Sequence, residues 1–139
     1  GIMTFMSGLK TYLQSRHTHY TTTGLYFGYM DMTYFAFTPP ELKDRNLKIA
    51  IVYLHQENRF ELWLGGTNRK VQAAYINLFK EKDIAPYKLS QVSPGVDSII
   101  ELIVSEQPDF DDADTLMQII EEKTVEFANR IISVLPKGV

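Results

Sequence analysis

Apolar side chains recur with a helical period in three parts of the chain. Near the N-terminus, apolar positions spaced by three and four residues form one helix face, which predicts an amphipathic helix over residues 3–16. A second helix should begin after Gly65-Gly66, with Thr67 as its N-cap. Its buried stripe is expected at Val71, Ala74, Tyr75, Leu78 and Phe79. A long closing helix is predicted from Leu116 to Leu135, because Pro136 cannot continue it.

The segments between these helices have the composition of strands. Residues 25–37 are rich in aromatic side chains, which predicts a strand that Pro39-Pro40 stops. Residues 40–46 form a polar connection with room for one helical turn. Residues 47–54 and 59–64 predict a hairpin across a four-residue loop, and further strands are expected at 87–92 and 98–104.

The faces of this hairpin depend on its register. If paired residue numbers sum to an even value, one face, clearly the core, holds Ala50, Val52, Leu54, Phe60, Leu62 and Leu64. The other face then holds Ile49, Ile51, Tyr53, Arg59, Glu61 and Trp63. Because this second face mixes apolar and charged side chains, we expect it to be covered at one end and open at the other.

The element order α-β-β-β-α-β-β-α predicts an α+β fold with helices packed on a mainly antiparallel sheet. The length of 139 residues is that of one domain, assigned to residues 1–139. Gly1 is not an initiator residue, so we expect a trimmed start, and an N-terminal extension of the natural chain would account for it.

Five short segments have distinctive sequences, at residues 28–35, 59–64, 68–72, 97–99 and 108–110. Together they resemble an uncharacterised family of small bacterial proteins, and the resemblance extends over nearly the whole chain, from residue 2 to residue 135. No activity is assigned to that family. The resemblance therefore implies a bacterial protein and supplies no functional residues.

Composition excludes several kinds of chemistry. The chain has no cysteine, which rules out disulfides, cysteine-based zinc sites, iron–sulfur clusters and thiol catalysis. It has no apolar run long enough to span a bilayer and no visible signal peptide, so we expect a cytoplasmic protein without membrane contact. No cofactor and no metal site is expected.

Charge is unevenly distributed along the chain. Residues 97–139 hold ten acidic and three basic residues, whereas the first 96 hold seven acidic and eleven basic residues. This asymmetry indicates either two solvated surfaces or a basic face for an anionic partner. Because the whole chain is acidic, with a net charge of −3, a nucleic-acid partner is not expected.

The aromatic run at residues 25–37 is expected to lie mainly in the core. Its odd positions share one face, so some of them are expected to line a groove. These positions are Tyr29, Asp31, Thr33 and Phe35.

The segment Gly65-Gly66-Thr67-Asn68-Arg69-Lys70 is the strongest candidate for a ligand site. A glycine-rich loop entering a helix exposes backbone N–H groups, and the helix dipole favours an anion there. The dipole disfavours the cations Arg69 and Lys70 in the first turn, and a bound anion would remove that conflict. The segment lacks P-loop spacing. We expect either a solvated basic turn or an anion site made by Gly65, Gly66, Thr67, Arg69 and Lys70, with Arg59 and Trp63 nearby.

Asp31, Arg59 and Glu61 are charged residues within otherwise apolar strands. A buried carboxylate is costly unless it is paired, so Arg59 and Glu61 should share a face, where Asp31 can join them. The cluster is either a structural ion-pair network or a polar pocket. The layout is comparable to the restriction-endonuclease-like core, in which Asp31 and Glu61 would be weak catalytic candidates that hold a metal ion. That core has a lysine two positions after its glutamate, where this chain has Trp63.

Two other groups of polar residues favour structural explanations. The acidic residues at positions 106–114 lack the glycine of a calcium loop and suit the N-terminus of the closing helix. His17, His19 and His55 have no third metal ligand placed by the sequence.

Three hypotheses follow for function. We favour a non-catalytic module that binds an anionic small molecule or a protein partner at residues 65–70. The alternatives are a divergent metal-dependent phosphodiesterase that uses Asp31 and Glu61, and a structural subunit that forms a homodimer through its aromatic surface.

Overall fold

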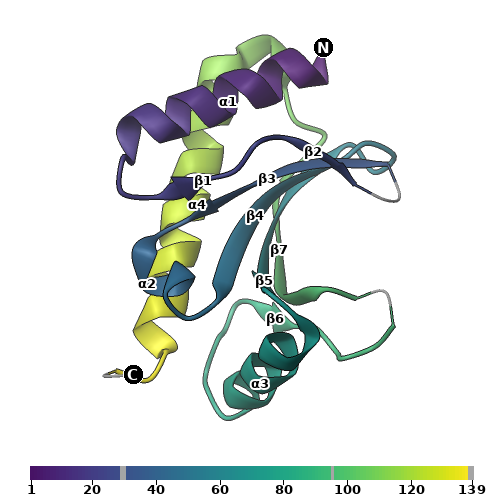
Figure 1. Cartoon of the computed structure of the whole chain (residues 1–139). Helices are drawn as coiled ribbons and strands as arrows, with labels where there is room; N and C mark the ends of the chain where they lie inside the picture. The colour runs from purple at the N-terminus through teal and green to yellow at the C-terminus, as the bar shows by residue number, and fades with distance from the viewer. Residues whose placement is uncertain (29–30, 95, 138–139) are drawn as a thin grey trace.

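The computed structural model describes residues 1–28, 31–94 and 96–137. Its elements, drawn in Figure 1, are α1 (Ile2–Arg16), β1 (Thr21–Thr22), β2 (Tyr26–Gly28), β3 (Met32–Thr38), α2 (Pro40–Lys43), β4 (Leu47–Leu54), β5 (Arg59–Gly66), α3 (Arg69–Lys80), β6 (Lys88–Leu89), β7 (Ser98–Glu106), η1 (Phe110–Asp112) and α4 (Ala113–Val134). The predicted α+β class and the order of its main elements are confirmed. The helical turn expected after Pro39 is α2.

An antiparallel sheet of seven strands forms the centre of the fold. The strand order is β1-β3-β4-β5-β7-β6, and β2 also pairs with β3. The prediction of one continuous strand over residues 25–37 is wrong, because β2 and β3 within it pair antiparallel with each other. Asp31, just before β3, has a φ angle of 60°, which an extended strand does not allow.

β4 and β5 form the predicted hairpin, but the even-sum register is wrong. Leu54 pairs with Arg59 across the four-residue loop, so the numbers of paired residues sum to an odd value. An even number of loop residues imposes this parity. The core face of the hairpin therefore holds Ile49, Ile51, Tyr53, Phe60, Leu62 and Leu64. The opposite face, which we call the open face, holds Ala50, Val52, Leu54, Arg59, Glu61 and Trp63.

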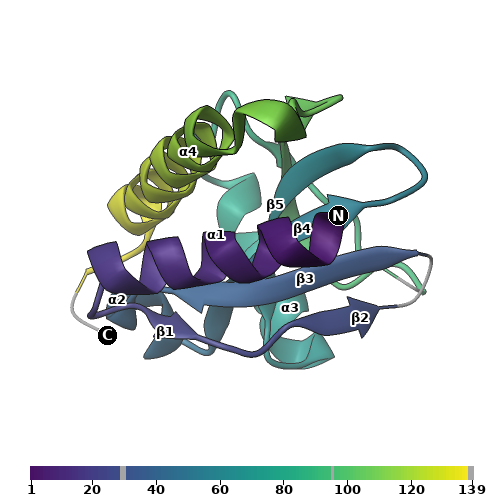
Figure 2. The same cartoon turned by 90° about the horizontal axis from the view of Figure 1, so that it is seen from above.

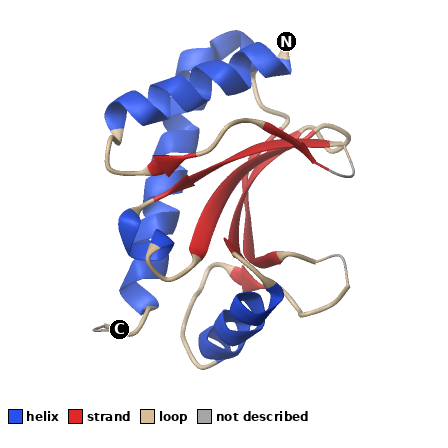
Figure 3. Ribbon diagram, in the orientation of Figure 1, coloured by secondary structure: helices blue, strands red, loops and turns tan. Residues whose placement is uncertain are grey.

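One hydrophobic core joins the helices to the sheet. α1 and α4 pack on the core face, and α3 lies beyond the end of β5, at the bottom of Figure 1 (Figures 1 and 2). The most deeply buried side chains include Met6, Leu9 and Leu13 from α1, Phe35, Phe37 and Phe60 from the sheet, and Ile120, Phe127 and Ile131 from α4. Within the described ranges, no helix crosses the open face, as the colouring by secondary structure in Figure 3 makes visible.

A buried carboxylate links α1 to α4. Glu121 of α4 is hydrogen-bonded to Tyr12 Oη at 3.0 Å, Arg16 Nε at 2.6 Å and His17 Nε2 at 2.7 Å. Burial raises the pKa of Glu121, but the hydrogen bonds from Arg16, His17 and Tyr12 outweigh it and hold the pKa below the ordinary value of 4.5. The ionised carboxylate therefore contributes to holding the two helices together.

α4 is the longest helix, with 22 residues. The carboxylate of Asp112 accepts a hydrogen bond from the backbone N–H of Thr115 at 3.4 Å and caps the helix, which is the structural role expected for this acidic segment. Neither α4 nor any other helix in the described residues has the length and apolar content needed to cross a membrane.

Candidate functional site

The open face carries side chains in rows that run across the strands. One row consists of Tyr34, Val52, Glu61 and Ile103 from β3, β4, β5 and β7. The next row consists of Ala36, Ala50, Trp63 and Glu101. Lys48, Gly65 and Ser98 follow in the last row. Ala50 has a minimal side chain and Gly65 has none. The surface of the open face is therefore depressed at these two residues, between the larger side chains around them.

The aromatic segment contributes its even positions to this face. Met32 and Tyr34 lie here half-buried, whereas Thr33 and Phe35 are buried in the core at 1% and 0% exposure. The expectation that odd positions line a groove is therefore wrong for Thr33 and Phe35. Tyr29 lies outside the described residues. Successive side chains of β3 alternate between the two faces of the sheet. Tyr34 pairs with Val52 of the open face, so the even positions of β3 lie on that face.

Arg59, Glu61 and Trp63 form a hydrogen-bonded group along β5, which we call the β5 triad. Arg59 Nε donates to Glu61 Oε2 at 2.6 Å, and Trp63 Nε1 donates to Glu61 Oε1 at 2.7 Å. Glu61 is only 3% exposed, so both of its oxygens need these partners. The hydrogen bond to Glu61 also raises the pKa of Arg59 above its ordinary value. The triad thus fixes the orientation of the Trp63 indole.

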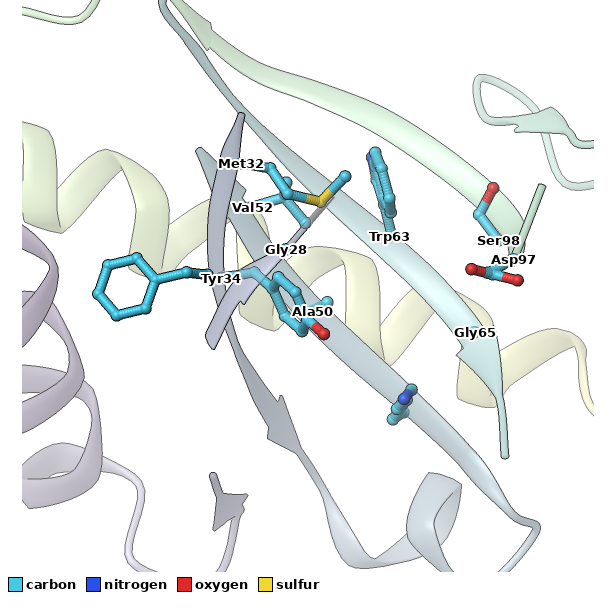
Figure 4. A pocket seen from close by; sticks show the side chains of 11 residues that line it. Gly28, Met32, Tyr34, Ala50, Val52, Trp63, Gly65, Asp97 and Ser98 are labelled. Atoms are coloured by element: carbon cyan, nitrogen blue, oxygen red, sulfur yellow. The ribbon is translucent and has the colours of Figure 1, made fainter. Parts of the chain in front are cut away.

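A pocket of about 410 Å³ lies beside Trp63 on the open face. Figure 4 shows Met32, Tyr34 and Trp63 around a floor that includes Ala50, with acidic and hydroxyl side chains toward one end. The complete lining is Phe27, Gly28, Met32, Tyr34, Lys48, Ala50, Val52, Trp63, Gly65, Asp97 and Ser98. Its walls are therefore mainly apolar and aromatic, and its charged groups are confined to Lys48 and Asp97.

Gly28 makes the close packing of this wall possible. A Cβ added to Gly28 would lie 2.8 Å from Cγ of Met32 and 3.1 Å from Cε1 of Tyr34. Tyr34 also stacks on Tyr26, with ring centroids 5.4 Å apart. These contacts hold Met32 and Tyr34 against β2 at the edge of the pocket.

A second pocket of about 400 Å³ lies on the other side of the β5 triad. Its lining alternates in charge, with Arg59 and Lys88 against Glu61 and Glu101. Arg59 and Glu61 form an ion pair with each other, so these two charged side chains are less free to bind a ligand in the second pocket.

The start of α3 differs from the prediction. The N-cap is Asn68, not Thr67: Asn68 Oδ1 accepts a hydrogen bond from the backbone N–H of Val71 at 2.9 Å. The side chain of Asn68 reaches the free N–H groups of the first turn, and Thr67 instead donates its backbone N–H to Asn46 O at 3.0 Å. Ala74, which was expected in the buried stripe, is exposed, and Gln72 is buried in its place.

Arg69 is used within the protein. Its Nη1 donates to the carbonyl oxygens of Val96 at 2.7 Å and Ser93 at 3.2 Å, and its Nη2 lies 3.3 Å from Oδ1 of Asp97. These contacts compensate for the unfavourable place of a cation at a helix N-terminus. The conflict that suggested an anion at this turn is thus largely removed by the loop that faces it, and Lys70 remains exposed.

The two glycines ahead of α3 have different roles. A Cβ added to Gly66 would lie 2.9 Å from the backbone nitrogen of Gln72, so Gly66 allows the first turn of α3 to pack on β5. A Cβ added to Gly65 would meet nothing closer than 3.7 Å, because Gly65 borders the pocket.

The structure does not bring Asp31 and Glu61 together. Asp31 is exposed in the turn before β3, and its carbonyl oxygen accepts a hydrogen bond from the backbone N–H of His55. Glu61, in contrast, is 3% exposed and belongs to β5, which is separated from β3 by β4 in the sheet. Both oxygens of Glu61 are occupied by Arg59 and Trp63. Among the described residues, no group of three or more histidine, aspartate or glutamate side chains is placed to hold a metal ion.

The predicted ligand-binding residues therefore separate into groups. Trp63 and Gly65 line the pocket beside Trp63, and Arg59 lines the second pocket. Gly66, Thr67, Arg69 and Lys70 line neither.

Sequence reasoning missed nine of the eleven pocket residues, which are Phe27, Gly28, Met32, Tyr34, Lys48, Ala50, Val52, Asp97 and Ser98. The loop length of the hairpin was the available signal for Ala50. Its four residues determine the parity that places Ala50 beside Trp63 on the open face.

Comparison with known proteins adds a family and no activity. No curated protein matches the chain, and no solved structure does. A family model matches residues 1–135, which is nearly the whole chain, and it confirms the resemblance to an uncharacterised family. The chain thus belongs to the family described as a domain of unknown function, DUF7000.

Proposed function

We propose that this protein is a non-catalytic binding module that holds a small molecule on the open face of its sheet, in the pocket beside Trp63. The observation that carries the proposal is the pocket itself, about 410 Å³ in volume and walled by Tyr34, Met32 and Trp63. This volume lies within the usual range for small-molecule sites, which are mostly apolar with a few polar groups. The proposal keeps a ligand-binding role for Trp63 and Gly65 and moves the site from the start of α3 to the sheet.

The β5 triad supports a binding role because it prepares one wall of the pocket in advance. The hydrogen bond from Trp63 to Glu61, whose other oxygen is bound by Arg59, restricts the rotation of Trp63, so a ligand does not have to order this side chain when it binds. The indole N–H is occupied by Glu61, and the remaining surface of the ring is apolar. Trp63 is therefore suited to contact an apolar group.

The hollow shape of the surface favours a small molecule over a second copy of the chain. Exposed apolar side chains do occur near the pocket, with Phe27 at 73% and Tyr26 at 50% exposure, and such side chains are common in protein interfaces. However, an obligate dimer interface resembles a domain core cut in half and is filled by side chains. A pocket floored by Ala50 and Gly65 leaves space that a small molecule fills more readily.

A non-catalytic role fits the geometry better than phosphodiester hydrolysis does. Metal-assisted hydrolysis needs carboxylates close enough to coordinate one ion, at about 2 to 2.6 Å from each oxygen. Asp31 is exposed in the turn before β3, whereas Glu61 is buried in β5 with both oxygens hydrogen-bonded to Arg59 and Trp63, so the two carboxylates do not form such a pair. The proposal also takes over two expectations from the sequence, a bacterial origin, which rests on the family resemblance, and a cytoplasmic location, which rests on the lack of an apolar span and of a visible signal peptide.

Trp63 provides a direct assay, because it is the only tryptophan in the chain. A library of small aromatic and aliphatic compounds is screened by thermal shift, and each hit is titrated while the emission of Trp63 is recorded. A ligand at 100 times its Kd stabilises a protein by about 2.7 kcal/mol, which raises the Tm of a domain of this size by about 10 °C.

A blocking variant makes this assay specific for the pocket. Ala50→Leu adds three carbon atoms to the pocket floor, and Ala74→Leu makes the same change on the exposed side of α3. We expect hits that change Trp63 emission to lose their affinity in Ala50→Leu and keep it in Ala74→Leu. A flat screen, or hits that bind Ala50→Leu normally, would refute the proposal. Dimerisation that depends on Tyr26 and Phe27, measured by sedimentation, would support the structural subunit instead.

A further inference from the structure

The charged end of the pocket beside Trp63 is asymmetric. Asp97 is 83% exposed at its side chain, and its Oδ1 already lies 3.3 Å from Nη2 of Arg69. Lys48 lines the same end, and within the described part of the chain no carboxylate lies within 4.0 Å of its ammonium group. The uncompensated charge at this end is therefore positive.

Lys48 is an exposed residue that borders the pocket from β4. Lys48 lies opposite Gly65 in the β4–β5 ladder. Its Cε lies 3.7 Å from the site of a Cβ on Gly65, so the aliphatic part of Lys48 covers the space that Gly65 leaves empty. A lysine that packs its methylene groups along apolar surface keeps its ammonium group at the edge of that surface.

The opposite end of the pocket is aromatic and carries no charge. Tyr34 and Trp63 are its aromatic walls, and Met32 contributes a flexible thioether side chain that adapts to flat rings. The side chains of Tyr34, Met32 and Trp63 all border the same hollow in Figure 4. A ligand that satisfies both ends has an aromatic body and one anionic group.

We propose that the pocket binds a small aromatic carboxylate, with its ring between Tyr34 and Trp63 and its carboxylate at Lys48. This inference rests on the proposed function and adds the chemical class of the ligand. The net charge of −3 does not oppose such a ligand, because its carboxylate would be bound by one local lysine. The anion is thus expected at β4, and not at the start of α3.

An isosteric pair of compounds tests this proposal. Naphthoate and naphthamide have the same ring system and nearly the same shape, but only naphthoate carries a charge. Affinities are measured by titration calorimetry for the natural sequence, Lys48→Gln, Lys70→Gln and Ala50→Leu. Lys70 is the matched control, because it is an exposed lysine in the first turn of α3, where the sequence predicted an anion site.

We expect the natural sequence to bind naphthoate about three to ten times more tightly than naphthamide, which is the range for a charge pair at a partly exposed site. Lys48→Gln removes this preference, whereas Lys70→Gln retains it. Added salt weakens naphthoate binding and not naphthamide binding.

Other results separate the failure of this proposal from that of the proposed function. Equal binding of both compounds, blocked by Ala50→Leu, refutes the anion and leaves the pocket as a binding site. A preference that is lost in Lys70→Gln and kept in Lys48→Gln refutes the proposal and returns the anion to α3. Binding of neither compound, or binding that Ala50→Leu does not reduce, overturns the proposed class of ligand at this pocket.

Discussion

Replacing Glu61 tests whether the β5 triad holds Trp63 in place. In Glu61→Ala the indole N–H loses its buried acceptor, and an unsatisfied buried donor costs about 1 to 3 kcal/mol. Arg59 loses its ion pair as well, but its side chain is 33% exposed, so water replaces most of that interaction and its share is at most about 1 kcal/mol. We therefore expect the free energy of unfolding to fall by about 1 to 4 kcal/mol.

Glu61→Gln separates the two contributions. Glutamine retains an acceptor for the indole and loses the charge that pairs with Arg59, so we expect a loss of about 1 kcal/mol. Urea unfolding followed by circular dichroism measures the free energies, and fluorescence anisotropy reports whether Trp63 becomes more mobile. Glu57→Ala is the control, because Glu57 is exposed in the loop of the same hairpin. If Glu61→Ala destabilised the protein no more than Glu57→Ala, the triad would have no structural role and our reasoning would be refuted.

Three further predictions test parts of the structure around the site. Gly66→Ala should lower the free energy of unfolding by about 1 to 3 kcal/mol, because its Cβ would lie 2.9 Å from a backbone nitrogen of α3, whereas Gly65→Ala should change it by less than about 0.5 kcal/mol. Equal effects of the two variants in urea unfolding would contradict the different packing of the two glycines. The pKa of Glu121 is lower in the folded protein than in the unfolded chain, so its stabilising effect is present above about pH 4.5 and is lost as the pH falls through the folded pKa. The difference in unfolding free energy between the natural sequence and Glu121→Gln should therefore shrink in acid, and a constant difference would count against the role of the Glu121 charge. Arg69→Ala removes the donor to Val96 O and should accelerate amide hydrogen exchange at Val96, and unchanged exchange would show that the contact does not order this loop.

The elements of the fold were largely predictable because hydrophobic periodicity reflects burial directly. The hairpin of β4 and β5 is the clearest case, since two apolar runs flank a short polar loop. The single strand expected over residues 25–37 was wrong for a related reason. Aromatic content favours a strand but does not show where the chain reverses, and the positive φ angle of Asp31 has no strong sequence signal.

The candidate site was less predictable because it depends on register and on contacts between distant segments. A shift of one residue in the register of β4 and β5 moves Ala50 from the core face to the open face. Likewise, Arg69 carries the signature of an anion site only when the first turn of α3 is considered alone. Its partners Val96 and Asp97 lie more than 25 residues away in sequence, so local pattern could not reveal that they use its guanidinium group.

The central claim, that a ligand binds on the open face beside Trp63, is tested most directly by nuclear magnetic resonance of the nitrogen-labelled protein during titration with naphthoate. The single indole N–H resonance identifies Trp63 without ambiguity. We predict that this resonance shifts together with the amides of Tyr34, Ala50 and Gly65, while the amides of α1 and α4 stay in place. Shifts confined to the first turn of α3, or to α1 and α4, with an unmoved indole resonance would contradict the account.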